Sequence, residues 1–301
     1  MTQVSVVVLS WNTAELTLAC LRSVVEAFAS EGIVGEMVVV ENASEDDSAA
    51  RIASELPSAR LICNAENRGY AAGVNQGVAA SKGQWVLLLG SDARLSAGAL
   101  SELLTFMESA TGYGACAPRL VDADGETQRA CSSFPLPRTA LWFGTPLQSW
   151  FPRSRELNRY FMRDFAHDVD ADVVQPPATC LFFSQELWDS LGGMDEELWL
   201  FFNDVDLCKR LSERGLKLRY LVGPSAQHVG GASTALYSGF VERWHTDRLG
   251  YLRKHHGLLG ALMARLGTSW AMGAWVLRRL FFLERDPFWG RFRGYLRFLR
   301  A

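Results

Sequence analysis

Residues 4–12 read Val-Ser-Val-Val-Val-Leu-Ser-Trp-Asn, and this stretch indicates the fold of the chain. Its run of mostly β-branched apolar residues is typical of a strand that is buried on both faces of a parallel sheet. A polar turn ends the run, and the helical pattern that follows has an apolar face at Leu16, Cys20, Leu21 and Val24. We therefore predict a strand over residues 4–9 and a helix behind it.

The same order of strand and helix recurs through the first third of the chain. Helical patterns alternate with short apolar runs that predict further strands, at residues 37–40, 60–63 and 85–89. Such alternation indicates the α/β class, with an open, mostly parallel Rossmann-like sheet and helices on both faces. Ligands of these sheets bind beyond the carboxyl ends of the strands. The polar segments at these ends are the first candidates for a site: residues 10–12, 41–44, 64–69 and 90–93.

The pattern is less regular after residue 109. Residues 132–170 are rich in Pro, Trp, Phe and Arg without a clear period, which favours a long loop region with short helices. Pro176 and Pro177 interrupt an otherwise strand-like run. We also predict a turn at 121–125, a helix that begins near Asn203, a strand over 217–222 and a helix over 240–256.

The composition is that of a packed globular protein, with 49% hydrophobic and 21% charged residues. The six cysteines are far apart and show no CxxC spacing, which favours reduced thiols in a cytosolic protein over disulfides or a zinc site. No signal peptide is evident. The apolar stretch over 266–277 is too short for a transmembrane helix, which needs about 20 residues.

Five segments, in this order and spacing, resemble a known family. They are residues 6–12, residues 39–44 (Val-Val-Glu-Asn-Ala-Ser), residues 66–77 (beginning Glu-Asn-Arg-Gly-Tyr), residues 192–207 (with Gly-Gly-Met-Asp-Glu and then Asn-Asp-Val-Asp-Leu) and residues 228–233 (His-Val-Gly-Gly-Ala-Ser). Together they resemble the inverting glycosyltransferases of family two, which have a GT-A type fold, and their rhamnosyltransferase-like members above all.

Three positions depart from the family pattern. Gly90-Ser91-Asp92 holds one acid where an Asp-x-Asp-like triplet is usual, and Asn203-Asp204 stands where Glu-Asp is usual. Pro176-Pro177 stands where a glycine is common.

The resemblance implies an enzyme that moves a sugar, with rhamnose as one candidate, from a nucleotide-diphosphate sugar to a glycan or lipid-linked glycan in cell-surface polysaccharide synthesis. The implied parts are a nucleotide-sugar-binding half over 1–110, an acceptor-side half with the catalytic acid over 111–235, and a C-terminal helical segment over 236–301. Substrate contacts are expected from polar strand ends and the following loops: Ser10, Asn12, Glu41, Asn67, Arg68, Gly69, Asn75 and Ser91.

The residue types suit these contacts. A carboxylate such as Glu41 accepts hydrogen bonds from a nucleobase N–H or from sugar hydroxyls. The N–H groups of residues 67–69 and the Arg68 side chain could meet phosphate or base at the start of a helix. For Gly73 and Gly77, which are four residues apart, we favour close packing of that helix on the sheet.

The resemblance implies a divalent cation, Mg²⁺ or Mn²⁺, held by Asp92 and His228. A hard cation on carboxylate oxygen neutralises charge on a diphosphate, and Mg²⁺ needs only one or two protein carboxylates because phosphates and water complete its shell. The alternatives are an aspartate that bonds to its own turn and a packed or solvated histidine.

Asp204 is the candidate catalytic base, because a carboxylate within hydrogen-bond reach can take the proton of an acceptor hydroxyl. The alternative is a structural one, with Asn203 as helix cap and Asp204 and Asp206 favoured by the positive helix start. Both can hold together for Asp204, whereas Asp206 is expected to be structural.

The last residues suggest contact with an anionic surface. Residues 265–301 hold eight arginines against Glu284 and Asp286, within a chain whose net charge is −3. On a helical wheel Arg293, Arg297 and Arg300 lie opposite aromatic and leucine residues, as in an interfacial amphipathic helix. We expect a cytoplasmic protein, peripheral at the inner face of the membrane through residues 265–301. The alternatives are a helical cap on the catalytic domain and a dimer contact.

Two alternative functions are compatible with a similar sheet. One is a non-catalytic nucleotide-sugar-binding or scaffold protein, suggested by the acids missing at Gly90 and Asn203. The other is a nucleotidyltransferase or a Rossmann oxidoreductase, which is disfavoured because no GxGxxG follows the first predicted strand. No nucleic acid is expected as a partner.

Overall fold

The computed structural model describes residues 2–231, 237 and 239–282, with side chains up to residue 278. The chain forms two compact units. The first contains Met1–Cys131, Ala166–Glu196 and Asn203–Leu236, and the second contains Ser132–Phe165, Glu197–Phe202 and Tyr237–Ala301. The arginine-rich wheel predicted for the tail lies beyond residue 282, outside the described residues.

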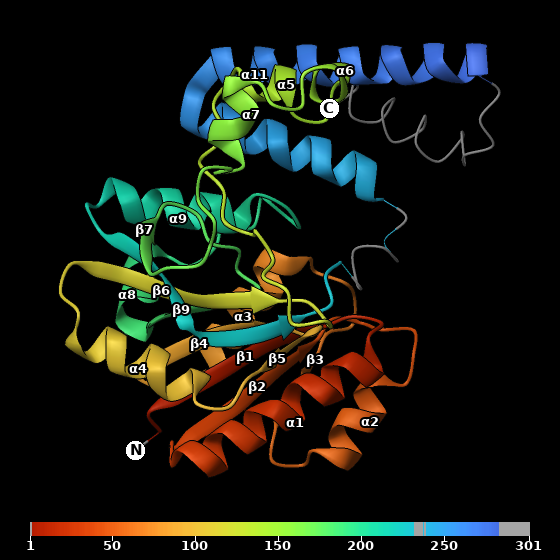
Figure 1. Cartoon of the computed structure of the whole chain (residues 1–301). Helices are drawn as coiled ribbons and strands as arrows, with labels where there is room; N and C mark the ends of the chain where they lie inside the picture. The colour runs from red at the N-terminus through yellow and green to blue at the C-terminus, as the bar shows by residue number, and fades with distance from the viewer. Residues whose placement is uncertain (1, 232–236, 238, 283–301) are drawn as a thin grey trace. The chain divides into compact units, whose positions relative to one another are not determined.

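The first unit is built on one sheet in the order β3-β2-β1-β4-β8-β6-β9-β5, with β7 paired to β9 (Figure 1). The predicted strands are present and run parallel to one another: β1 (Val4–Ser10), β2 (Gly35–Glu41), β3 (Arg60–Cys63) and β4 (Trp85–Gly90). The predicted α/β class with a Rossmann-like sheet is thus confirmed.

The other half of the sheet mixes strand directions. β8 (Cys180–Ser184) is antiparallel to β4 and to β6 (Tyr113–Val121), while β9 (Lys217–His228) is parallel to β6 and antiparallel to β5 (Ala93–Leu95) and β7 (Ala171–Val173). The run interrupted by Pro176 and Pro177 is therefore two separate strands, β7 and β8.

Helices cover both faces of this sheet, as predicted. α1 (Ala14–Glu31), α2 (Ser48–Glu55) and α4 (Ala99–Ser109) share one apolar core with Val4, Val6 and Val8 of β1. α3 (Tyr70–Ala80) packs on the opposite face, where a Cβ at Gly73 would collide with Leu9 and a Cβ at Gly77 would lie 2.5 Å from Val7. Close packing explains both glycines.

β9 continues beyond the predicted end at residue 222. Its pairing with β6 moves from Pro118↔Leu221 to Arg119↔Ser225, so Val222, Gly223 and Pro224 are three extra residues on β9. Gly-Pro normally terminates a strand, but here it lies in a bulge. The strand therefore extends to His228, which pairs with Ala93.

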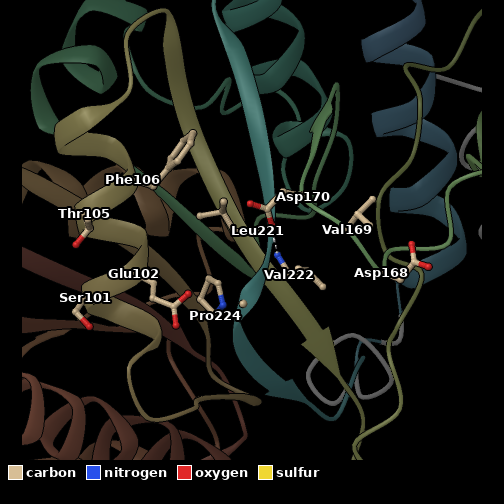
Figure 2. A pocket seen from close by; sticks show the side chains of 11 residues that line it. Ser101, Glu102, Thr105, Phe106, Asp168, Val169, Asp170, Leu221, Val222 and Pro224 are labelled. Atoms are coloured by element: carbon tan, nitrogen blue, oxygen red, sulfur yellow. Dashed lines mark hydrogen bonds between the residues drawn. The ribbon is translucent and has the colours of Figure 1, made fainter.

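A pocket of about 710 Å³ borders this bulge (Figure 2). Its lining comes from α4, from residues 168–170 and from β9: Ser101, Glu102, Thr105, Phe106, Asp168, Val169, Asp170, Leu221, Val222, Gly223 and Pro224. None of the residues predicted for the substrate, metal or catalytic site lines it.

The second unit contains three short helices, α5 (Thr139–Trp142), α6 (Pro146–Trp150) and α7 (Arg155–Tyr160), and the long α11 (Phe240–Phe282). α11 has a kink at Gly257, whose φ of 59° is not helical. The predicted helix over 240–256 thus ends where the glycine changes the backbone direction, and a second helical segment follows.

A polar group is buried inside this unit. Arg248 Nη2 donates to Thr268 Oγ1 at 2.7 Å, and His245 Nδ1 lies 3.0 Å from that hydroxyl. Burial, with the nearby Arg248 charge, lowers the pKa of His245 to about 3.

No helix of the described residues has the length and hydrophobicity to cross a membrane. All six cysteines are free thiols, and Cys63 alone is exposed.

Candidate active site

Parallel pairing brings the predicted strand ends to one edge of the sheet. Ser10 pairs with Glu41, and Leu9 pairs with Gly90, so β1, β2 and β4 end side by side. The polar residues that follow these strands come from distant parts of the sequence but share this edge. This is the place where α/β sheets bind ligands.

A chain of hydroxyl groups fixes the β1 and β4 ends to each other. Ser10 Oγ lies 3.0 Å from Thr17 Oγ1, which lies 3.1 Å from Thr13 Oγ1, which lies 3.2 Å from Ser91 Oγ. Ser10 and Ser91 are buried. Their side chains therefore support the edge from inside and hold the residue before Asp92 in place.

The turns after β1 and β2 hold each other. Asn12, with φ of 53°, donates its backbone N–H to Ser44 Oγ at 2.8 Å, and its side-chain oxygen accepts from Glu45 N at 2.7 Å. Glu41 Oε1 accepts from Ser44 N at 2.8 Å. Glu41 is 4% exposed, and its carboxylate contacts the turn that follows β2.

Asn42 organises the loop before α3, a role that the sequence did not predict. Its Oδ1 accepts from Asn64 Nδ2 at 3.0 Å and from Arg68 N at 3.1 Å, and its Nδ2 donates to Asn67 Oδ1 at 2.9 Å. Asn67 Oδ1 also accepts from Gly69 N at 2.9 Å. Asn67 and Gly69 thus form the loop, while the Arg68 side chain is exposed.

Asn75 clamps a loop of the first unit. Its Nδ2 donates to Met194 O and to Glu196 Oε1, both at 2.9 Å, and its Oδ1 accepts from Met194 N at 2.8 Å. These contacts fix the Gly-Gly-Met-Asp-Glu segment on α3.

Asp92 and His228 meet through the pairing of β5 and β9. His228 Nε2 lies 3.6 Å from Asp92 Oδ1, and Val229 N donates to Asp92 O at 3.1 Å. A Cβ at Gly90 would lie 3.1 Å from Asp92 Oδ1 and 3.3 Å from Thr179 Cγ2, so a side chain at this position would require these neighbours to move by a few tenths of an ångström. Among the described residues, no group of three or more His, Cys, Asp or Glu could hold a metal ion.

The Pro176-Pro177 segment joins the β4 end to Asp204. Thr179 O accepts from Gly90 N at 2.7 Å, while Ala178 N and Gln175 Nε2 donate to Asp204 Oδ2 at 3.4 and 3.2 Å. One short segment therefore contacts both the end of β4, which precedes Asp92, and Asp204. The donors from this segment to the Asp204 carboxylate are neutral N–H groups.

Asp204 lies in the first turn of α9 (Asn203–Glu213). Its Oδ1 accepts from Val205 N at 2.8 Å, and the residue as a whole is of intermediate burial. Desolvation raises the pKa of Asp204 above its usual 3.8, against the opposing effect of these hydrogen bonds. A carboxylate with a raised pKa is a better proton acceptor.

Tyr70, at the start of α3, is within electrostatic influence of the carboxylates of Asp204 and Asp92. Burial raises the pKa of its phenol, and the negative charges of Asp204 and Asp92 raise it further. Its hydroxyl donates to Ala178 O at 3.4 Å. Tyr70 stands in the segment over 66–77 that carries the family resemblance, and this was the one signal that could have marked it.

The neighbours of Asp204 on α9 have structural contacts. Asn203 Oδ1 accepts from Asp204 N at 2.8 Å. Asp206 is fully buried and pairs with Arg210 Nε at 2.8 Å, and the same guanidinium donates to Leu191 O and Gly193 O. Asp206 therefore has the structural role expected of it.

The sheet, its polar edge and the acid at the start of α9 define a GT-A type α/β protein. The family model of Glycosyl transferase family 2 matches residues 5–170, which is more than half of the chain. The chain belongs to this family.

The chain is also similar to individual proteins. It is 23% identical over 256 residues to an N-acetylglucosaminyl-diphospho-decaprenol L-rhamnosyltransferase of Mycobacterium tuberculosis, covering 80% of this chain and 79% of the relative. Over 90 residues it is 37% identical to the succinoglycan biosynthesis protein ExoO of Rhizobium meliloti, covering 30% and 25%.

One solved structure, GalNAc-T7 with UDP, GalNAc and Mn²⁺, superposes with a TM-score of 0.57 at 13% identity. The match covers 92% of this chain and 58% of that one, and at 13% identity it shows that the two chains share a fold.

Proposed function

We propose that this glycosyltransferase moves a sugar, with inversion, from a nucleotide-diphosphate sugar to a lipid-linked glycan during cell-surface polysaccharide synthesis. One observation carries the proposal: Asp204, a residue of intermediate burial, has a raised pKa and is tied by residues 175–179 to the ligand edge of the sheet. The names of the mycobacterial rhamnosyltransferase and of ExoO support the acceptor class and the process.

In this proposal, residues 1–110 bind the donor. Glu41 and Asn12 form the turns next to the nucleoside, and the loop held by Asn42 presents Arg68 to phosphate or base. Ser10, Ser91, Asn67, Gly69 and Asn75 act mainly by shaping this edge, because their described polar contacts are made within the protein. Residues 111–235 supply the acceptor side, and the described part of the predicted C-terminal helical segment is α11.

Asp204 acts on the acceptor. Its carboxylate takes the proton of the attacking hydroxyl while the hydroxyl oxygen bonds to the anomeric carbon, and the bond from that carbon to the diphosphate oxygen breaks with its electron pair going to the diphosphate. Attack on the face opposite the leaving group inverts the anomeric centre. Only the ionised form of Asp204 can accept the proton.

The proposed divalent cation is Mg²⁺ or Mn²⁺, and Asp92 and His228 would hold it. Their donor atoms fit one ion, because two ligands that are each about 2.1 Å from it lie at most about 4.2 Å apart, and Nε2 and Oδ1 are 3.6 Å apart. When bound, such an ion neutralises negative charge on the diphosphate. The Mn²⁺ of GalNAc-T7 supports this part of the proposal.

Two experiments test the proposal. Calorimetry with UDP, GDP and dTDP, each with and without Mn²⁺, should reveal one preferred nucleotide whose affinity depends on the metal. Incubation with nucleotide sugars and a polyprenyl-diphosphate-linked acceptor should then yield an extended glycan of inverted configuration. Folded protein that neither transfers nor hydrolyses any donor of a broad panel would contradict the proposal and favour a binding protein.

We extend the proposal to a peripheral position at the cytoplasmic face of the membrane. Within the described part of α11, large apolar side chains are exposed, with Leu258 85%, Leu259 60% and Leu262 52% accessible. Exposed apolar residues near basic ones favour an interface with anionic lipid. The protein should sediment with vesicles containing anionic lipid, and Leu259→Glu with Leu262→Glu should weaken this. Equal sedimentation of that double variant would contradict a role for this face.

A further inference from the structure

Gln128 follows β6 and contacts both the backbone and the ring of His228. Its Nε2 donates to His228 O at 2.8 Å, and its Oε1 lies 2.8 Å from His228 Nδ1. The backbone of Gln128 is itself fixed, because its N–H donates to Leu120 O and its carbonyl accepts from Ala130 N, both at 2.9 Å. A segment that is hydrogen-bonded through its backbone therefore places one amide side chain against one imidazole.

These two contacts determine where the hydrogen of the imidazole lies. The carbonyl oxygen of His228 can only accept, so the amide nitrogen of Gln128 must face it. The amide oxygen then faces Nδ1, and because this oxygen can also only accept, Nδ1 must carry the hydrogen. In a neutral imidazole the other nitrogen, Nε2, holds a lone pair.

The nitrogen that carries this lone pair lies near an acid. Nε2 of His228 lies 3.6 Å from Oδ1 of Asp92. Two electron-rich atoms at this distance repel each other unless a positive charge lies between them. A cation that binds both atoms would relieve the repulsion.

We propose that Gln128 is a positioning residue, which fixes the tautomer and orientation of His228 so that Nε2 and Asp92 together face a divalent cation. The proposal rests on the proposed function, because the cation is the one expected on the donor diphosphate. Groups that orient a histidine ligand through its other nitrogen commonly contribute about 10–100-fold to metal affinity.

Three variants separate the contacts. Gln128→Met keeps the length of the side chain and removes both hydrogen bonds. Gln128→Glu keeps an acceptor for Nδ1–H and loses the donor to His228 O. Gln227→Met is the matched control, because Gln227 precedes His228 on β9, is similarly half-buried and makes one long hydrogen bond, at 3.5 Å, to Asp122 O.

The first measurement is the tautomer of His228 in metal-free protein. Long-range ¹H–¹⁵N correlation spectra of ¹⁵N-histidine-labelled protein contain five imidazoles, and His228→Gln identifies the signal of interest. We expect Nδ1–H in the wild type, in Gln227→Met and in Gln128→Glu, and loss of this preference in Gln128→Met. An Nε2–H tautomer in the wild type, or an unchanged tautomer in Gln128→Met, would overturn the proposal.

The second measurement is Mn²⁺ affinity with the preferred nucleotide diphosphate, followed by electron paramagnetic resonance. Gln128→Met should bind Mn²⁺ about 10–100-fold more weakly than the wild type, and Gln227→Met should match the wild type. Unchanged Mn²⁺ affinity in Gln128→Met would contradict a contribution of Gln128 to metal binding. If the wild type itself binds no Mn²⁺, the metal part of the proposed function fails, while the tautomer measurement still decides whether Gln128 orients His228.

Discussion

The start of α9 in the first unit and the first half of α11 in the second each carry an aspartate that accepts hydrogen bonds from loop backbone. Asp204 accepts from Ala178 N, and Asp247 accepts from Leu200 N and Phe201 N, both at 2.9 Å. Desolvation raises the pKa of both carboxylates. A raised pKa therefore does not distinguish a catalytic acid from a structural one in this protein.

The two regions differ in access and in charge. Asp247 is 1% exposed and has the cation of Arg243 at 3.7 Å, whereas Asp204 is partly exposed and none of its described hydrogen-bond donors is charged. A substrate hydroxyl can reach a carboxylate only where solvent can. Access to solvent and neutral hydrogen-bond donors, together with a raised pKa, distinguish Asp204 as the candidate base.

The largest effect is expected from Asp204→Asn. It removes the proton acceptor while it keeps the size of the side chain, so kcat should fall by about 10²–10⁴-fold, the usual contribution of a general base. Steady-state transfer assays measure kcat and KM separately. Asp247→Asn is the matched control, and its kcat should stay close to that of the wild type. Equal loss in both folded variants would remove the distinction between the two regions.

Arg210→Met should give the second largest effect, on stability. The change leaves the fully buried Asp206 without its ion-pair partner, and breaking a buried pair costs about 3–5 kcal/mol. Urea unfolding measures the free energy directly. If the stability of this variant matched that of the wild type, the ion pair would not be what holds α9.

The pH dependence should be smaller but specific to Asp204. Because its folded pKa lies above 3.8, the folded state holds this proton more tightly than the unfolded state does. Its stabilising contribution is complete below the unfolded pKa and is lost as pH rises through the folded pKa. Activity has the opposite trend, since it needs the ionised form, so its acid limb should lie above pH 3.8.

Two pH profiles measure this effect. Between about pH 4 and pH 8, the unfolding free energy of the wild type should fall relative to that of Asp204→Asn. A difference between the two proteins that does not vary with pH would show that the pKa of Asp204 is the same in the folded and unfolded states.

The smallest effect is expected from Arg243→Met. The guanidinium is 3.7 Å from Asp247 Oδ1, which is too long for a strong hydrogen bond, and its side chain is 32% exposed. Thermal unfolding should therefore show a loss of about 1 kcal/mol or less. A loss several times larger would mean that Asp247 depends on this cation more than on the two backbone amides.

The sequence predicted the parallel half of the sheet almost to the residue. Buried parallel strands are continuous apolar runs, and β1, β2 and β4 have this pattern, while β3 is a short run at the edge of the sheet. The short β5 and the continuation of β9 were not predicted, because three residues give no periodicity and Gly223-Pro224 is usually a terminator. His228 could be assigned near Asp92 only through the family resemblance.

The positioning residues were the hardest to predict. Asn42, Gln128 and Gln175 are neutral amides whose partners lie 25 or more residues away in at least one contact, so no local pattern reveals them. Asp247 was missed for a related reason: its backbone partners lie 46 and 47 residues earlier. Charge and periodicity in a sequence indicate strands and candidate acids, whereas hydrogen bonds between distant residues are seen only in the structure.

The three extra residues of β9 limit how the length of this chain can vary. Alternate residues of a strand point to opposite faces, so a change of one residue between Leu221 and Ser225 that the bulge did not absorb, and that shifted the pairing after it, would turn His228 to the other face of the sheet. A change of two residues would keep the face but move the imidazole by about 6.6 Å along the strand. Insertions and deletions in this segment are therefore expected to be selected against, although it lies on the surface beside a pocket and far in sequence from Asp92.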